Sequence, residues 1–487
     1  MLKLLDNTQH KLDAKDVWGK KTKYQDFLRF ISSDTIENLN KKDGGILVWP
    51  HSFKDCNDNL ANMKILEYKD DIIQTSNLVG FIGDGDVEIE INSRFSEPKT
   101  VFTQEKKNGT LVETKKNVTV DYFLYYMLSK VFSANIVNLE VDGGSLKELD
   151  LLLFVFPRLL KSAMQQGMYK RYVKKEYNDS NIRGTININR HIRYNNPTNG
   201  RIAYTTREFS YDNDITQLIR HTIEYMSTIP MGRALLNSDK EVEQYTRQII
   251  QVTPLYQKGE RHRVITANRT PLSHPYYNRY KALQQICLAI LRKEKMSHGS
   301  MSNKVHGLLI DVAWLWEEYI GIIMREEGFT HHTNKTAFKL FTRIEDGYEE
   351  GKNFQNIIPD YVWEQGGKKI IADAKYIPLH RFHKTDAERA SAIYYKTIMY
   401  MYRFATNIGF LFHPCSFEEA KDYDVTFQDY EIANGKNCHL YKVGLVIPDN
   451  KKCNDYKDFK EKIKVNEDIF RKKVNSLSPI SRTEALN

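Results

Sequence analysis

Two acidic residues and a lysine lie in a short, strand-like stretch, IIPDYVWEQGGKKIIADAKY, at residues 357–376. The runs on both sides of Gly366-Gly367 are rich in β-branched and aromatic residues, and a Gly-Gly pair suits a tight two-residue turn. The stretch therefore predicts a β-hairpin that carries Asp360, Asp373 and Lys375.

A turn centred on the two glycines fixes which residues face each other. The predicted pairs are Gln365 with Lys368, Glu364 with Lys369, Trp363 with Ile370, and Asp360 with Asp373. Opposed β-carbons are roughly 4.5 to 5.5 Å apart, and like charges at that separation destabilise a sheet unless something neutralises them. Lys375 lies on the same face as Asp373, two residues earlier. A one-residue bulge would break this register.

Two carboxylates that hold Mg²⁺ beside an ammonium group are suited to phosphodiester hydrolysis. The metal lowers the pKa of a bound water, and Lys375 would position that water or stabilise developing charge. The alternative is an ordinary surface hairpin, in which Asp360 follows Pro359 at a strand start and Lys375 extends its amine to solvent. Short patterns of this kind recur by chance, so the hairpin alone does not decide between the two.

The segment before the hairpin, LLIDVAWLWEEYIGIIMREEGF, predicts a helix that packs on the sheet. Its apolar stripe consists of Val312, Leu315, Trp316, Tyr319, Ile320, Ile323 and Met324. Glu317 and Glu318 flank this stripe on opposite sides, so either glutamate can reach a metal and periodicity does not choose between them. A helix with Lys396 near its centre and a buried strand, IGFLFHP, follow the hairpin. The predicted order is helix, strand, strand, helix, strand.

The rest of the chain predicts three parts in a fold of the α+β or α/β multidomain class. Residues 1–120 favour a mainly β domain, and residues 121–300 favour a mostly helical region with a β insertion. Within that region, residues 146–177 predict one long helix with a basic end. The polar segment 295–304 is the predicted linker to a nuclease domain at 301–487, which ends in a charged helical tail.

Composition narrows the classes of protein. Among 487 residues, 71 Lys and Arg against 62 Asp and Glu give a net charge of +9, which permits nucleic-acid contact without showing it. The five cysteines form no CxxC pair, which favours a reducing cytoplasm and no zinc site. No apolar run has the length of a membrane span. The chain lacks a G-x-x-x-x-G-K-[ST] motif, so we expect it to bind no nucleotide and another chain to supply any nucleotide hydrolysis.

The histidines in His331-His332 and in HRFH at residues 380–383 have no partner at zinc-like spacing. A solvated or phosphate-facing role is expected for them. Arg381, His383 and Lys384 follow the Lys375 strand and are candidates for contacts to a DNA backbone.

The predicted αββαβ core with its mixed sheet resembles the PD-(D/E)xK nuclease fold. In that resemblance Pro359-Asp360 is the "PD" and Asp373-Ala374-Lys375 is the "DxK".

Several blocks in order resemble the McrC family, the nuclease subunits of McrBC-type and LlaJI-type restriction systems. The blocks are VGFIGDGDVEIEINSRF, LLKSAMQQGMYKRYVKKEY followed by IRGTININRHIR, YDNDITQLIRHTIEYM, HPYYNRYKAL and LLIDVAWLWEEYI. The similarity runs from about residue 78 to residue 414.

The resemblance implies DNA cleavage with Mg²⁺, or Mn²⁺ in its place, and a hexameric AAA+ GTPase partner that the N-terminal part docks on and stimulates. It implies that Asp360, Asp373 and Lys375 are catalytic, that the Ala374 carbonyl joins both aspartates as a metal ligand, and it favours Glu317 over Glu318 because LWE matches the family's LFE.

The chain departs from the family pattern in the helix after the hairpin. Where the family usually has a glutamine four residues before a tyrosine, this chain has Lys396 before Tyr400. A lysine there is a candidate for contact with DNA phosphate.

The sequence therefore predicts the Mg²⁺-dependent endonuclease subunit of a GTP-driven restriction complex used in phage defence. The alternative, from a different class, is a non-catalytic assembly subunit that docks on the GTPase and only binds DNA.

Overall fold

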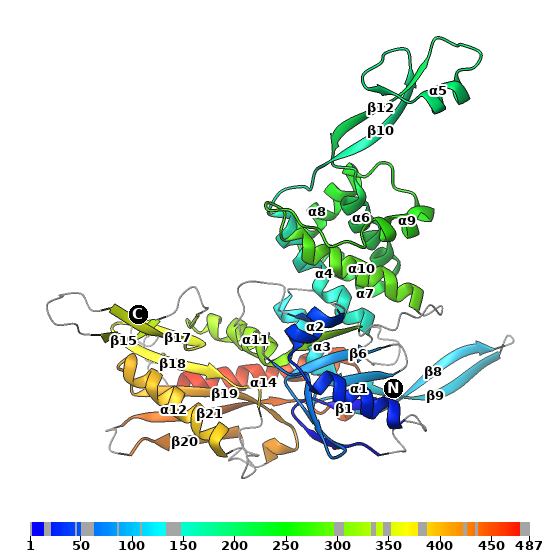
Figure 1. Ribbon diagram of the computed structural model, residues 1–487. Coiled ribbons are helices and arrows are strands. Elements are labelled where there is room, and N and C mark those ends of the chain that lie inside the picture. The colour runs from blue at the N-terminus through cyan, green and yellow to red at the C-terminus, as the bar shows by residue number, and fades with distance from the viewer. Residues whose placement is uncertain are drawn as a thin grey trace. The chain divides into compact units, whose positions relative to one another are not determined.

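The computed structural model divides into two compact units, which are described separately (Figure 1). The first comprises Met1–Val131, Val137–Glu148 and Met301–Asn487, and the second comprises Phe132–Ile136 and Leu149–Ser300. The structure describes residues 2–13, 21–43, 46–49, 63–84, 87–107, 110–132, 148–296, 306–332, 338–343, 352–377, 387–421, 426–433 and 437–477.

One sheet of the first unit joins four strands from the first 92 residues with a strand from beyond residue 300. Its five strands, in spatial order, are β1 (Leu2–Leu5), β7 (Glu88–Asn92), β6 (Leu78–Gly83), β13 (His306–Asp311) and β3 (Ile46–Trp49). β13 lies between β6, to which it is antiparallel, and β3, to which it is parallel. The compact units thus differ from the three predicted parts, because a strand from beyond residue 300 completes the N-terminal sheet.

Helices and smaller sheets surround this sheet, so residues 1–120 are not purely β. The elements are β2 (Gln9–Lys11), α1 (Lys21–Ser32), α2 (Ile36–Asp43), β4 (Leu66–Lys69), β5 (Ile72–Thr75), β8 (Glu97–Lys107), β9 (Thr110–Val120) and α3 (Tyr122–Val131). Buried side chains from both ends of the chain share one core, in which Leu28, Ile89 and Leu309 pack in the same cluster.

The rest of the first unit is built on a six-stranded mixed sheet, as the sequence predicts. In spatial order its strands are β14 (Thr330–His331), β17 (Tyr361–Gln365), β18 (Lys368–Ala374), β19 (Ile408–Ser416), β21 (His439–Ile447) and β20 (Phe427–Glu431). β18, β19 and β21 run parallel, and the other pairings are antiparallel. A separate hairpin consists of β15 (Phe338–Arg343) and β16 (Lys352–Ile357).

Helices cover both faces of the mixed sheet. The helices are α11 (Val312–Glu326), α12 (Ala387–Arg403) and α14 (Tyr456–Leu477). Successive residues of β19 show the two faces: Leu411 packs near Tyr394 of α12, whereas the Phe412 ring lies 5.2 Å from the Phe470 ring of α14. The predicted order of helix, strand, strand, helix and strand occurs as α11, β17, β18, α12 and β19, and the tail is helical as expected.

The second unit is a helical body that carries a β arm. The body consists of α4 (Glu148–Met164), α6 (Asp214–Thr228), α7 (Pro230–Leu236), α8 (Lys240–Val252), η3 (Lys258–Glu260), α9 (Arg261–Ala267) and α10 (Tyr280–Met296). The arm consists of β10 (Arg171–Asp179), β11 (Thr185–Ile186), α5 (Ile188–Tyr194) and β12 (Ile202–Ser210). Across the described ranges, no helix combines the length and the apolar character that a membrane span requires.

The prediction of one long helix over residues 146–177 was wrong in its second half. α4 ends at Met164, and Gly167 adopts a φ of +88°, a backbone conformation that favours glycine and stops a helix. The basic segment that follows is strand β10, which pairs along its whole length with β12.

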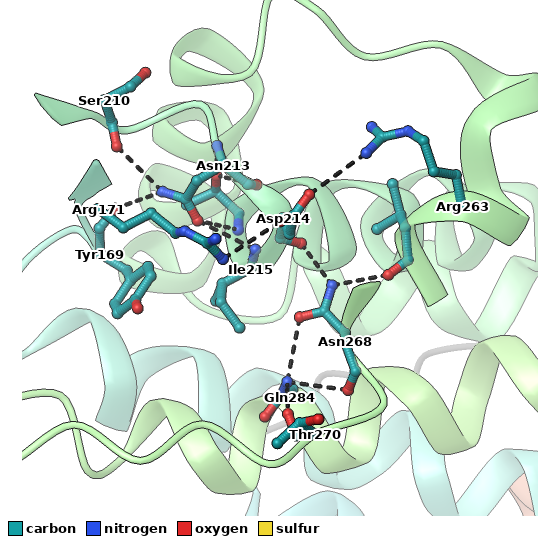
Figure 2. A network of polar contacts seen from close by, with 12 residues as sticks. Tyr169, Arg171, Ser210, Asn213, Asp214, Ile215, Arg263, Asn268, Thr270 and Gln284 are labelled. Atoms are coloured by element: carbon teal, nitrogen blue, oxygen red, sulfur yellow. Dashed lines mark hydrogen bonds and ion pairs between the residues drawn. The ribbon is translucent and has the colours of Figure 1, made fainter. Parts of the chain in front are cut away.

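A polar network anchors the arm to its helical body (Figure 2). Asn213, between β12 and α6, caps α6 through its side chain and donates to the Tyr169 carbonyl at 3.2 Å. Asp214 pairs with Arg171 at the start of β10, at 3.3 Å, and with Arg263 of α9, at 3.5 Å. Both strands of the arm are therefore fixed where they leave the body.

Gly80 lies where β6 pairs with β13, so a substitution there tests this pairing. It has a φ of +138°, and a β-carbon there would lie 2.0 Å from the Leu308 carbonyl oxygen of β13. We expect Gly80→Ala to lower the free energy of unfolding by about 3 kcal/mol, because β6 and β13 must separate to admit the methyl group. Gly167→Ala is the control, since Gly167 also has a positive φ but no atom within 4 Å. Equal losses in calorimetry would contradict the prediction.

Asp121 makes stability depend on pH. Its carboxylate caps α3 by accepting from the Leu124 amide at 3.0 Å, and burial raises its pKa from 3.8 to about 7. Because the pKa of Asp121 is raised in the folded state, its protonated carboxyl contributes fully to stability below about pH 4. This contribution is lost as the pH rises through about 7. Asp121→Asn should therefore exceed wild type in stability at about pH 8, by on the order of 2 kcal/mol. The difference should vanish towards about pH 4; a constant difference in thermal melts would refute this, with Asp26→Asn on α1 as the control.

Candidate active site

The hairpin formed by β17 and β18 has the predicted register. Gln365 pairs with Lys368, Glu364 with Lys369 and Trp363 with Ile370, without a bulge between β17 and β18. Gly366 and Gly367 have φ values of +57° and +74°, as a tight two-residue turn of this kind requires. The ladder ends at the pair of Tyr361 and Ala372, so Asp360 immediately precedes β17 and Asp373 lies next along β18.

The structure brings Asp360, Asp373 and Lys375 together. The Lys375 amine forms a close ion pair with Asp373 and lies 3.8 Å from Asp360 Oδ2. Asp360 Oδ2 also accepts from the Ala374 amide at 2.7 Å, which fixes this carboxylate against the end of β18. Asp373 is fully buried, on the sheet face that α12 covers.

Burial and mutual repulsion separate the protonation behaviour of the two acids. Burial raises the pKa of Asp360 well above its usual value, and the charges on Asp373 and Glu317 raise it further. Burial also opposes ionisation of Asp373, but the ammonium groups of Lys375 and Lys396 outweigh it and lower the pKa of Asp373. The two acids therefore differ, because the ammonium groups favour the charged form of Asp373 whereas burial and its neighbours disfavour that of Asp360.

Glu317 lies on α11 at the edge of this cluster. Its Oε1 lies 3.1 Å from Nε2 of His331, and its backbone carbonyl accepts a hydrogen bond from the Tyr361 hydroxyl. Burial disfavours a charged His331, yet the hydrogen bond to Glu317 raises the pKa of this histidine. Glu317 acts electrostatically on Asp360, Lys375, His331 and Tyr361, whereas Glu318 acts on His331 and Tyr361 alone among these four.

His331 is a site residue that the sequence did not identify. We expected the pair His331-His332 to be solvated or to face phosphate, but the His331 side chain is only 10% exposed and binds Glu317. The His332 amide in turn donates to the Asp360 carbonyl at 3.0 Å. Both contacts depend on the pairing of β14 with β17, which no sequence spacing signals.

The DNA-contact candidates have different outcomes. Lys396 lies on α12, with its amine 5.4 Å from the Tyr400 ring centre, and its charge lowers the pKa of Asp373. The Tyr400 hydroxyl donates to the Ile358 carbonyl at 2.9 Å, so α12 is tied to the segment before Asp360. Arg381, His383 and Lys384 lie outside the described residues.

Oxygen atoms suited to a hard cation are present at the acid pair. Both carboxylate oxygens of Asp373 are buried, and Lys375 forms an ion pair with the group. Two carboxylates and the Ala374 carbonyl fit Mg²⁺, which binds few protein oxygens and keeps several waters. In the described ranges, no three His, Cys, Asp or Glu side chains lie close enough together to hold a metal. Glu317 therefore lies beside the acid pair but is not a third ligand of it.

Comparison with known proteins identifies the family. The family model described as "McrBC 5-methylcytosine restriction system component" matches residues 73–414, well over half of the chain. A search of curated proteins found no match.

Two solved structures from Thermococcus gammatolerans resemble the chain. One is a refined half-complex from a tetradecameric assembly of McrB AAA+ hexamers with bound McrC, with 16% identity over 96% of this chain and 99% of that chain and a TM-score of 0.42. The other is the McrBC complex, with 14% identity over 67% and 87% of the two chains and a TM-score of 0.30.

The resemblance predicted for residues 78 to 414 is thus confirmed by the family match at residues 73–414. This chain belongs to the family of McrBC 5-methylcytosine restriction system components.

Proposed function

We propose that this chain is the Mg²⁺-dependent DNA endonuclease subunit of a GTP-dependent restriction complex. The observation that carries the proposal is the pair of Asp360, which is mostly buried, and Asp373, which is fully buried, with the Lys375 amine close to both. Together with membership of a restriction-system family, this arrangement favours phosphodiester hydrolysis over a purely structural hairpin. A surface hairpin would have no reason to bury two opposed acids.

The proposed metal ligands are Asp360, Asp373 and the Ala374 carbonyl. A bound Mg²⁺ would supply Lewis acidity towards the phosphate and a bound water of lowered pKa. Asp360 holds a proton more readily than an ordinary aspartate and must release it before it can act as a ligand. The amide of Ala374, which donates to Asp360, fixes the direction of this carboxylate before any metal binds.

Lys375 has the role that depends most on its position. In the described structure its amine contacts Asp373 and donates to the Ala374 carbonyl at 3.2 Å. If a cation bound the two carboxylates, the Lys375 ammonium would be free to contact the attacking water or the charge that develops on phosphate. Glu317, which His331 contacts, would add negative charge near that water, and Lys396 is a proposed contact to DNA phosphate.

Lys375→Ala should abolish cleavage while the complex still assembles. We expect the cleavage rate to fall on the order of 1000-fold, because no other group replaces the ammonium at the acid pair. DNA cleavage with Mg²⁺ and GTP, GTPase stimulation and complex formation should be measured in parallel. Lys369→Ala is the matched control, because Lys369 lies on the same strand but pairs with Glu364 at 3.3 Å.

A non-catalytic assembly and DNA-binding subunit would give a different result in the same measurements. If Lys375→Ala cuts DNA as fast as wild type, the assignment of the site is wrong. If wild type assembles, stimulates the GTPase and leaves DNA intact, the chain is the assembly subunit.

We further propose that an AAA+ GTPase subunit, hexameric as McrB is in the solved assembly, binds the β arm of this chain. Exposed large apolar side chains gather on the arm and beside its base. They are Tyr172, Ile182, Ile186, Ile188, Ile192, Tyr194, Phe209 and Tyr211. This surface is therefore proposed as a docking site in addition to residues 1–120, which were predicted to dock the partner.

Helix α5 shows most clearly that the arm lacks a cover. It buries no side chain, and Ile188 and Ile192, one turn apart, are 66% and 58% exposed. A helix of one to two turns gains little stability by itself and normally depends on packing. The arm extends away from α6, α8 and α9 of its own unit (Figure 1), so these helices do not supply that packing.

Replacing both isoleucines by serine should disrupt the complex. We expect Ile188→Ser with Ile192→Ser to weaken binding of the GTPase subunit by about 2 kcal/mol or more, and to reduce GTPase stimulation accordingly. Val465→Ser with Ile469→Ser is the matched control, since these residues are also four apart on a helix and are 58% and 62% exposed. Binding can be measured by calorimetry; equal losses in both double variants would refute a specific docking surface.

A further inference from the structure

The turn after β7, Asn92–Phe95, connects the N-terminal sheet with the strand that carries Lys375. β7 ends at Asn92, and the next three residues leave the sheet towards the end of β18. Asn92 accepts from the Asp6 amide at 2.9 Å, and the Asp6 carboxylate accepts from the Arg94 amide. The first and seventh strands therefore fix the backbone of Arg94.

The Arg94 side chain reaches the residue that follows Lys375. Its Nη2 donates to the Tyr376 carbonyl, and the guanidinium carbon lies 4.2 Å from the centre of the Tyr376 ring. The Phe95 ring packs edge-on against the same tyrosine, with 6.2 Å between ring centres. A cation and an aromatic ring from the N-terminal sheet thus hold both the backbone and the side chain of Tyr376.

Arg94 is half-buried, and the residues around it are buried. Asp6, Ser93, Asp121 and Tyr376 are all buried, and Arg94 Nη1 is buried without a hydrogen-bond partner. A charge in such a place is costly unless its contacts are kept. The hydrogen bond to the Tyr376 carbonyl is therefore expected to persist rather than to exchange with solvent.

The same sheet also holds the opposite side of the site. β13 pairs with β6 and passes directly into α11, whose first turn Asp311 caps by accepting from Ala313 and Trp314 amides at 2.9 and 3.3 Å. α11 carries Glu317. The N-terminal sheet consequently contacts the site at two points: through α11 near Glu317 and through Arg94 near Lys375.

We propose that Arg94 is a positioning residue of the nuclease site: by binding the Tyr376 carbonyl, it transmits the position of the N-terminal sheet to the Lys375 ammonium. The role rests on the proposed nuclease function, but the contact itself does not. Lys375 is held on its other side by its amide, which donates to the Phe412 carbonyl at 2.7 Å. Release of the Arg94 contact would leave the backbone after Lys375 anchored on one side only.

Two variants of Arg94 test this role in the full chain with its GTPase partner. Arg94→Met removes the charge and keeps the length, and should slow single-turnover cleavage by about 10- to 100-fold without changing DNA affinity or GTPase stimulation. Arg94→Lys should recover part of the rate, because an ammonium can bind the carbonyl but lacks the planar group that stacks on Tyr376. Arg29→Met, at an exposed arginine of α1 paired with Asp26, is the control.

Amide hydrogen exchange of the isolated full chain tests the contact independently of cleavage. The segment 371–377 should exchange faster in Arg94→Met than in wild type or Arg29→Met, while segments of β19 and β21 exchange as before. Unchanged exchange of this segment, or wild-type cleavage by a folded Arg94→Met, overturns the proposal.

The two proposals fail in different ways. A wild-type chain that leaves DNA intact refutes the proposed function, whereas faster exchange in the variant would still establish the contact. If Arg94→Met does not fold, Arg94→Lys decides: full wild-type cleavage and exchange would overturn the positioning role.

Discussion

Two carboxylates placed opposite each other away from water constrain everything around them. Asp360 and Asp373 cannot both be charged at low cost unless positive charge lies between them. Lys375 supplies one such charge, Lys396 acts on Asp373 from α12, and the pKa of Asp360 is raised because its own charge is disfavoured there. The proposed binding of a divalent cation would relieve the same repulsion, and the geometry of the pair would have to be held tightly for it.

The surrounding fold holds that geometry from several directions. Behind Asp373, the parallel strands β18, β19 and β21 are covered by α12 on one face and by α14 on the other. The N-terminal sheet adds contacts from outside the sheet that carries the acids. Because β13 belongs to that outer sheet and leads into α11, a displacement of the N-terminal sheet would move Glu317 directly. A site built in this way cannot be separated from the N-terminal segment without loss of support.

The parts that the sequence predicted are those set by neighbours along the chain. Gly366-Gly367 fixes the hairpin register locally, and the apolar stripe of α11 follows from helical periodicity. The missed features depend on residues far apart: His331 reaches Glu317 because β14 pairs with β17, and β13 joins strands that lie more than 200 residues earlier. Strand β10 was predicted as helix because its basic residues hide the alternation of apolar and polar residues that marks a strand. Gly167 was not recognised as the end of the preceding helix.

The two units differ in what they bury and what they expose: the first buries charged groups, and the second exposes apolar ones. The acid pair buries charge, which costs free energy unless positive charge lies close by, whereas the arm exposes apolar side chains, which costs free energy as long as nothing covers them. The polar network at the base of the arm explains how this exposed apolar surface can keep its conformation. Asp214, between Arg171 and Arg263, fixes the strands where they leave the helical body, so the order of the arm does not depend on burial at its tip. A partner would therefore meet a surface whose conformation is already set, and less of the binding free energy would be spent on ordering it.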